Sequence, residues 1–233
     1  EKGFLSLVHA FFCLFPADPH KGDSVPVITL MRVAQLTRRY SASMFTMKPF
    51  CTGFYRDIKG ALTSRGTRRV SFRTVCDIYA WRAHLLLCFT RLGDLATPIQ
   101  WPSFRNLSLD AVLAAADYTI YGDAASTDRH IGIYIVDVLW TSFPFPCSHY
   151  YANQKLTPVT IALLEMCALV GCALLAALHL PPRDTPIHIH IVTDNSNTYY
   201  QAMSGQSASP LLYLFLQMLQ FIAASANIMF TFS

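Results

Sequence analysis

The stretch IHIHIVTD, residues 187–194, alternates isoleucines with histidines and ends in a carboxylate. This period of two residues is typical of a strand, whose successive side chains point to opposite faces of a sheet. Asp194 is therefore expected at the carboxyl end of a strand. In open α/β sheets ligands are held at this end, so an acid there is a candidate for metal or phosphate chemistry.

Similar patterns predict the other elements of the second half of the chain. Runs rich in β-branched and aromatic residues indicate strands, and apolar runs that start at a capping residue and stop at proline indicate helices. The expected strands begin at residue 117, in a stretch that passes into a turn at 126–130, and cover residues 131–140 and 227–233, with a weaker edge strand over 141–151 because of its two prolines. The expected helices are residues 157–180, 195–204 and 210–225. This order of elements predicts an α/β domain.

The first half of the chain shows helical periodicity instead. Apolar residues recur at helical spacing over residues 24–44, 49–62 and 71–92, so we expect this part to be all-helical. The loop TSRGTRR, residues 63–69, concentrates three arginines, which are Arg65, Arg68 and Arg69. Such a loop suits contacts with phosphate groups, and a solvated loop without a ligand is the alternative.

These patterns divide the chain into three parts. We expect a basic helical region over residues 1–93, a connector with little periodicity over 94–116, and the α/β domain over 117–233. The chain opens with an apolar run that superficially resembles a signal peptide, but no small-residue cleavage site follows and there is no initial Met. We therefore expect the sequence to be a fragment, truncated after its last strand.

Charge is distributed unevenly along the chain. Residues 1–91 contain 14 Lys and Arg against 5 Asp and Glu, a net charge of +9, whereas residues 92–233 contain 4 against 9, a net charge of −5. This layout suits a polyanion that is held by the first part and acted on by metal-binding carboxylates in the second. The alternative is that the basic helices only present a solvated face.

Hydrophobic residues make up 53% of the chain and charged residues 14%, so membrane insertion has to be considered. The apolar helix at 157–180 is long enough to span a bilayer. It contains Glu165, lacks a flanking cluster of Lys or Arg, and precedes a clear strand, which favours a buried helix and no membrane contact. A small membrane protein with spans near 159–180 and 210–231 is the alternative.

Cysteine and histidine residues offer weaker signals. The seven cysteines form no C-x-x-C pair and mostly lie in apolar runs, so we expect reduced core residues of an intracellular protein, in the cytoplasm or nucleus. His188 and His190 share one strand face and could bind a metal, although exposed strand histidines are the commoner case.

Three acids are the main candidates for chemistry. Asp123 and Asp194 are expected at the ends of two strands, and Glu165 lies in the first half of the long apolar helix. An isolated ionised carboxylate in so apolar a helix is costly to desolvate, so Glu165 needs a partner, and a divalent metal is the natural one. The alternative for Asp194 is that, with Asn195, it merely caps the next helix.

The sequences YGDAASTDRHIGIYI, LLEMCALVGCALL and IHIVTDNSNTYYQAM present Asp, Glu and Asp in an order that resembles the ribonuclease H fold. More narrowly, they resemble the ribonuclease H domain of retroelement reverse transcriptases of the DIRS type or a related LTR type. The basic residues 1–93 are similar to the tether between the polymerase thumb and the nuclease in those polyproteins. The resemblance implies a ribonuclease H-like mixed sheet flanked by helices, preceded by a smaller all-α basic segment.

By this resemblance, Asp123, Glu165 and Asp194 would coordinate two Mg²⁺ ions, or Mn²⁺, for hydrolysis of the RNA strand of an RNA–DNA hybrid. The hybrid would be recognised by its shape and its 2′-hydroxyls rather than by base sequence. The polymerase part of the same polyprotein is a further expected partner. Ser126 and Asn195 would contact the nucleic-acid backbone, although a turn or cap role suits each of them equally.

The chain departs from this family's pattern in three ways. A fourth acid or a nearby histidine usually follows the last strand, and no such residue follows here. The first motif reads DAAS where DAS is more usual, and the chain has no Y-x-D-D polymerase motif. The missing fourth acid favours the alternative of a catalytically inactive module that binds nucleic acid or protein.

Overall fold

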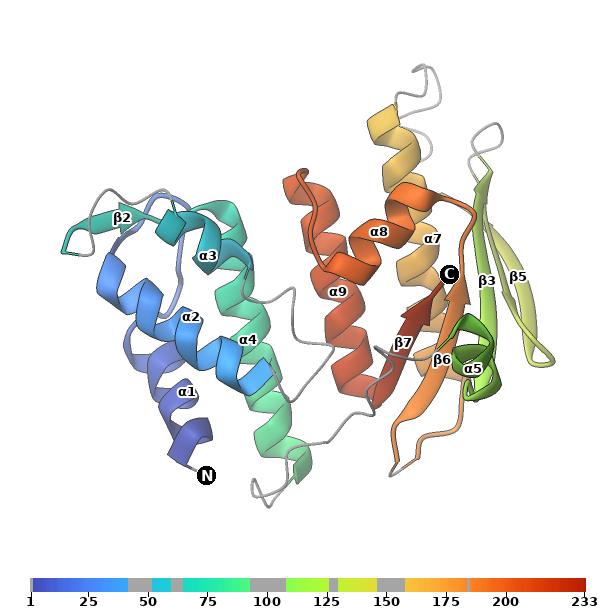
Figure 1. The fold of residues 1–233 in the computed structure, drawn as a ribbon, viewed down its shortest axis with the longest axis horizontal. Helices are drawn as coiled ribbons and strands as arrows, with labels where there is room; N and C mark the ends of the chain where they lie inside the picture. Colours follow the sequence, from blue (N-terminus) through green and yellow to red (C-terminus); the bar gives the residue numbers. More distant parts are fainter. Residues whose placement is uncertain are drawn as a thin grey trace. The chain divides into compact units, whose positions relative to one another are not determined.

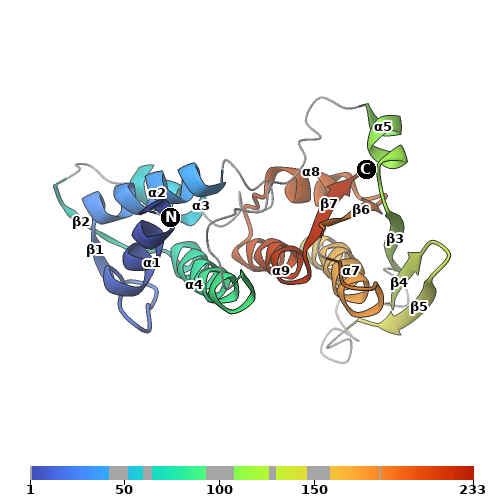
Figure 2. The same cartoon turned by 90° about the horizontal axis from the view of Figure 1, so that it is seen from below.

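The computed structural model describes residues 2–41, 52–59, 65–92, 108–125, 130–145, 158–183 and 185–233. The chain divides into two compact units, residues 1–102 and residues 103–233 (Figures 1 and 2). Each unit has its own cluster of buried apolar side chains, so each is described by itself.

The first unit packs its helices around an aromatic core. Phe11, Phe54 and Trp81 are fully buried, and the rings of Phe11 and Trp81 stack with their centroids 5.5 Å apart. The elements are α1 (Lys2–Cys13), β1 (Ser24–Pro26), α2 (Val27–Ser41), α3 (Thr52–Lys59), β2 (Thr67–Arg69) and α4 (Phe72–Leu92). The three predicted helices correspond to α2, α3 and α4, and the apolar run at the start of the chain forms α1.

The expectation that this part is all-helical is wrong. β1 and β2 form an antiparallel pair in which Val25 lies opposite Arg68. Arg68 and Arg69 therefore belong to a strand, and only Arg65 lies in the segment before it. Strands of three residues are too short to show a period of two, so the sequence pattern does not reveal them.

Two buried charged side chains of the first unit are used to satisfy helix ends. Asp57 accepts hydrogen bonds from the backbone N–H of Ser71 at 2.8 Å and from the hydroxyl of Thr74 at 2.5 Å, at the start of α4. Arg82 donates from Nε to the carbonyl oxygen of Phe11 in the last turn of α1 at 2.9 Å, and its other nitrogens donate to carbonyls that follow the helix. Helix ends leave unsatisfied backbone groups, so these contacts have a structural role.

Among its described residues, the second unit has a five-stranded sheet flanked by helices. The elements are α5 (Leu109–Ala114), β3 (Tyr118–Ala125), β4 (His130–Ile135), β5 (Leu139–Pro144), α7 (Pro158–His179), β6 (Ile187–Val192), α8 (Ser196–Ser204), α9 (Pro210–Ala226) and β7 (Ile228–Phe232). The strand order is β5-β4-β3-β6-β7. β3, β4 and β5 pair antiparallel, whereas β6 pairs parallel with both β3 and β7. The predicted mixed α/β architecture is confirmed at this level.

The helix α7 is the centre of the second unit's core. α7 and α9 lie side by side over one face of the sheet, and α5 lies on the opposite face (Figures 1 and 2). Between the two long helices and the sheet, apolar side chains of β3, β4, β6 and β7 form one continuous cluster. Burial in this cluster explains the apolar side chains of α7 that face the sheet and α9, but not Leu174 and Leu178, which are 48% and 69% exposed.

Two elements of the second unit differ from the sequence prediction. The strand expected over 131–140 is a hairpin, because β4 ends at Ile135 and β5 begins at Leu139. Asp137 adopts a positive φ of 59° in the turn between them, a conformation that Asp tolerates better than most residues. β5 is an edge strand, as expected for the segment with prolines. The segment 94–116, expected to be a connector, contains the short helix α5.

The membrane alternative expects one apolar helix near residues 159–180 and another near 210–231. Among these helices, Ile161–His179 alone is long and apolar enough to cross a membrane, and half of it is buried inside the structure. The second span expected by that alternative, residues 210–231, is not one helix, because it is divided between α9 and β7.

Candidate metal centre

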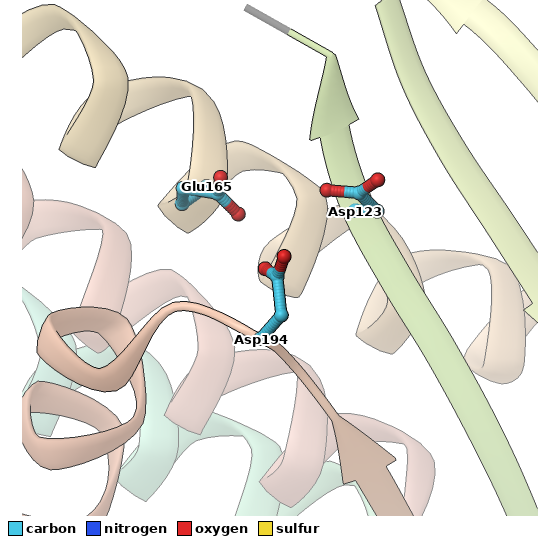
Figure 3. Close-up of side chains that lie close together, drawn as sticks. All are labelled: Asp123, Glu165 and Asp194. Carbon is cyan, nitrogen blue, oxygen red and sulfur yellow. The ribbon is translucent and has the colours of Figure 1, made fainter.

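Asp123, Glu165 and Asp194 lie together in the second unit (Figure 3). Asp123 is near the end of β3, Glu165 is in the first half of α7, and Asp194 follows β6 by two residues. One carboxylate oxygen from each residue lies within 4.8 Å of those of the other two. The aspartates are exposed, whereas only 7% of the Glu165 surface is accessible. The three acids predicted from the sequence therefore form one cluster with an open side and a buried side.

The pairing of β3 with β6 explains why two of these acids meet. The two strands pair in parallel from Tyr118 and Ile189 as far as Tyr121 and Val192. Beyond that point β6 ends and the chain turns toward α8, while β3 continues (Figure 1). The aspartates lie just past the last paired residues, at the carboxyl ends of neighbouring parallel strands, where open α/β sheets hold their ligands.

A close approach between α7 and β3 brings the third acid to the same place. A Cβ atom added to Gly122 would lie 2.5 Å from the Sγ atom of Cys172 and 3.6 Å from the carbonyl oxygen of Ala168. Only a glycine therefore allows β3 to pack this closely on α7. Glu165 precedes Ala168 by about one helical turn, so the same contact places it beside Asp123. Gly122 is a positioning residue that the sequence analysis missed, although its place directly before Asp123 was a visible signal.

The electrostatics of the cluster are unfavourable without a cation. The pKa of Glu165 is raised from its ordinary 4.5 to about 7, first by burial and then by the negative charges of Asp194 and Asp123. Its Oε2 atom is buried and has no hydrogen-bond partner among the described residues. An unpaired buried carboxylate oxygen is costly, so the centre requires either a proton or a positive ion at this atom.

The donor set fits a hard divalent cation. Three carboxylates offer only oxygen ligands, which suit Mg²⁺, Ca²⁺ and Mn²⁺ better than metals that prefer nitrogen or sulfur. A cation among the three oxygens would neutralise the repulsion between them and would satisfy the orphaned oxygen of Glu165. The cluster can therefore hold a metal ion.

Asn195 has the structural role that the sequence analysis kept as an alternative. Its side-chain oxygen accepts a hydrogen bond from the backbone N–H of Thr198 at 3.0 Å and caps the N-terminus of α8. The cap is thus provided by Asn195 and not by Asp194, whose carboxylate stays exposed in the cluster.

The other residues predicted to bind nucleic acid belong to the first unit or lie outside the described part of the chain. Ser126 is one of the residues that the structure does not describe. Arg65, Arg68 and Arg69 belong to the first unit, where Arg65 and Arg69 are exposed and Arg68 is partly buried.

The expectation of exposed histidines on β6 is wrong, because His188 and His190 are only 4% and 0% exposed. Nδ1 of His188 lies 2.9 Å from the carbonyl oxygen of Ala115, and its Nε2 lies 2.8 Å from the Thr231 hydroxyl. The two nitrogens of His190 contact the hydroxyls of Thr231 at 2.9 Å and Ser233 at 2.8 Å. All four ring nitrogens thus have protein partners, so these histidines join β6 to its neighbours rather than bind a metal.

Comparisons of the chain with protein-family models, with curated protein sequences and with solved structures give no significant match. The class of site is therefore defined by the cluster itself. Two of its carboxylates lie at the ends of neighbouring parallel strands, and the third lies on the helix that connects the two halves of the sheet.

Proposed function

We propose that residues 103–233 form a ribonuclease H-like domain that hydrolyses the RNA strand of RNA–DNA hybrids with the help of Mg²⁺. The observation that carries the proposal is the convergence of Asp123, Glu165 and Asp194 around the unpaired Oε2 atom of Glu165. The order of the elements supports it as well. This order agrees with the one that the sequence resemblance implies. It consists of a strand with Asp, an antiparallel hairpin, a helix with Glu and a parallel strand followed by Asp.

The centre has an exposed side and a buried side with different roles. The exposed carboxylates of Asp123 and Asp194 face solvent, where a phosphodiester can approach, and Glu165 anchors the cluster from the core. Two Mg²⁺ ions, when bound, would activate the attacking water and stabilise the leaving oxygen. Without a cation the three acids would repel a phosphate, and Glu165, whose pKa is raised to about 7, would be about half protonated at neutral pH.

The substrate class and the biological setting follow from the sequence resemblance. A hybrid duplex would be recognised by its shape and 2′-hydroxyls. The basic first unit, with Arg65, Arg68 and Arg69, would contact phosphates of the same duplex. The polymerase part of a retroelement polyprotein would supply the hybrid inside the cell, in the cytoplasm or nucleus.

A second candidate function is a related module that binds nucleic acid or protein without cleaving it. The observation that favours it is that residues 195–233 contain no Asp, Glu or His. Among the described residues the centre has three carboxylates, whereas the resemblance implies a further acid or histidine.

Cleavage of a labelled RNA–DNA hybrid in Mg²⁺ tests the first candidate. We expect the 233-residue chain to cut the RNA strand, and Asp194→Asn to lower the rate by about a hundredfold or more, because a metal ligand is lost. Asp137→Asn is the matched control, since it removes an exposed aspartate at a positive φ that Asn also tolerates. Equal cleavage by the chain and Asp194→Asn would contradict the proposal. Binding of the hybrid without cleavage by either protein would favour the second candidate.

A further inference from the structure

Three large aromatic side chains line up across the outer half of the sheet. Tyr121 on β3 lies directly opposite Tyr134 on β4, and Tyr134 lies directly opposite Trp140 on β5. All three are exposed, by 48%, 41% and 70% respectively. The rings of Tyr121 and Tyr134 stack with centroids 6.2 Å apart and planes inclined by 23°. We call these three residues the aromatic row.

The aromatic row lies on the face of the sheet that α7 and α9 leave uncovered. Successive residues of a strand point to opposite faces. Ile120, Ile133 and Ile135, which neighbour the tyrosines along their strands, are buried in the core with the side chains of α7. The aromatic row therefore points away from α7.

The aromatic row and the carboxylate centre share strand β3. Asp123 follows Tyr121 by two residues, a distance of about 7 Å along a strand. Asp123 lies opposite Gly132, and Gly132 lies opposite Ser142, so the next row of the sheet carries only short side chains beyond the aspartate. A Cβ atom added to Gly132 would meet no atom within 4 Å, so the surface beside Asp123 is open.

The stability of the sheet does not account for the whole row. Cross-strand aromatic pairs stabilise hairpins, and this explains the stacked tyrosines. Trp140 adds little to that contact, because more than two thirds of its surface faces solvent. Clusters of exposed large apolar side chains are typical of binding surfaces.

The charge of the second unit indicates how such a surface would hold a nucleic acid. Residues 103–233 contain 4 Lys and Arg against 8 Asp and Glu, a net charge of −4. Attraction to phosphates by basic side chains is therefore weak in this unit. Aromatic rings bind bases by stacking, which needs no positive charge and tolerates any base sequence.

We propose that Tyr121, Tyr134 and Trp140 form a stacking platform for unpaired bases of a nucleic-acid strand that extends from the carboxylate centre across β3, β4 and β5. The proposal rests on the proposed function, because that function places a phosphodiester at Asp123. Bases inside a duplex stack on each other, so the platform takes single-stranded nucleotides that flank the hybrid. Three neighbouring strands span about 10 Å, which suits two or three bases.

The platform is tested by comparing the binding of a blunt hybrid with that of a hybrid that carries an unpaired tail on one strand, placed on the RNA strand or on the DNA strand. The affinities are measured by fluorescence polarisation on the whole chain, with Ca²⁺ in place of Mg²⁺ to prevent turnover. We expect the tailed hybrid to bind more tightly than the blunt one. Trp140→Leu should weaken binding of the tailed hybrid by about five-fold to a hundred-fold and leave the blunt hybrid unaffected.

Three features separate stacking from a structural role of the tryptophan. Trp140→Phe keeps a ring and should retain most of the affinity. Leu178→Ala is the matched control, because Leu178 on α7 is 69% exposed and lies away from this face. The slope of affinity against salt concentration should be the same for the chain and for Trp140→Leu, since stacking releases no counterions. A folded Trp140→Leu protein that binds the tailed hybrid as tightly as the unchanged chain would overturn the platform. The same result is expected if this face binds another protein instead of nucleic acid, so that case would also overturn it.

The platform and the nuclease proposal fail in different ways. If Asp194→Asn leaves cleavage unchanged but Trp140→Leu weakens binding of the tail, the proposed function is wrong and the platform stands. If cleavage depends on Asp194 and Trp140→Leu binds the tail normally, the platform is wrong and the nuclease stands.

Discussion

Glu165 is the residue whose state depends most on what the carboxylate centre binds. Its pKa in the folded protein is about 7 because of burial and the two neighbouring aspartates, whereas the ordinary value is 4.5. Between these values the folded protein holds the proton more tightly than the unfolded chain does. The unfolding free energy of the metal-free protein therefore falls as the pH rises from about 4.5 to about 7.

Glu165→Gln should remove this pH dependence, because glutamine keeps the shape of the side chain and cannot ionise. At pH values above 7 we expect the metal-free variant to be more stable than the unchanged protein by roughly 3 kcal/mol. Below the ordinary pKa of glutamate the two proteins should have nearly equal stability. Urea unfolding with a chelator present, at a pH on either side of this window, measures the difference. The same pH dependence in both proteins would mean that Glu165 is ionised in the folded state without a cation.

At the residue scale, the sequence predicted the acids better than the histidines. A strand pattern that ends in Asp194 and a single acid in an apolar helix are both visible in one sequence. The burial of His190 is not visible, because it depends on Thr231 and Ser233, which reach it only when β7 pairs with β6. Alternation along a strand shows that two faces differ, and only the tertiary structure shows whether the polar face is covered.

At the scale of elements, the contact between α7 and β3 decides whether the centre can form. The Cβ atom of an alanine at position 122 would lie 2.5 Å from the Cys172 sulfur, so either this sulfur must shift or α7 and β3 must move apart. Because Glu165 and Asp123 come from these two elements, such a movement would also separate two of the carboxylates.

Gly122→Ala should therefore destabilise the protein by about 1–3 kcal/mol and weaken binding of divalent cations. Gly132→Ala is the matched control in the neighbouring strand, because its added Cβ meets open space, and it should leave both properties nearly unchanged. Adding Cys172→Ala to the Gly122→Ala variant should restore much of the loss, since the clashing sulfur is removed. Thermal unfolding and a Mn²⁺ titration of the four proteins measure these effects. Equal results for Gly122→Ala and Gly132→Ala would show that the close approach does not position the site.

The sequence predicted the elements with clear periodicity or stop signals and missed α1, β1, β2 and α5. α7, β6, α9 and β7 have clear periodicity or clear stop signals, and their predicted bounds agree with the structure to within two residues. The turn at Asp137 was missed because it has no glycine, proline or asparagine, and β-branched or aromatic residues surround it. The aromatic row was missed for a different reason. Its members are close only through the register of three strands, which no pattern along the chain shows.

At the scale of the whole molecule, charge follows the division into two units. Residues 1–102 contain 14 Lys and Arg against 6 Asp and Glu, a net charge of +8, while residues 103–233 have a net charge of −4. This asymmetry is visible in the sequence alone, because charge can be counted without a structure. In the proposed function the basic unit binds phosphates by charge, whereas the acidic unit binds them through cations held by its carboxylates.

The measurement that tests the central claim most directly is calorimetric titration of Mn²⁺ into the metal-free 233-residue chain near pH 7, in two buffers with different ionisation enthalpies. We expect binding with the release of about half a proton, because Glu165 is then about half protonated and must ionise to bind a cation. Asp123→Asn should abolish this binding, and Asp137→Asn should leave it unchanged. Binding of equal strength to Asp123→Asn would contradict the assignment of the three carboxylates as a metal centre, and binding without proton release would contradict a raised pKa of Glu165 in that centre.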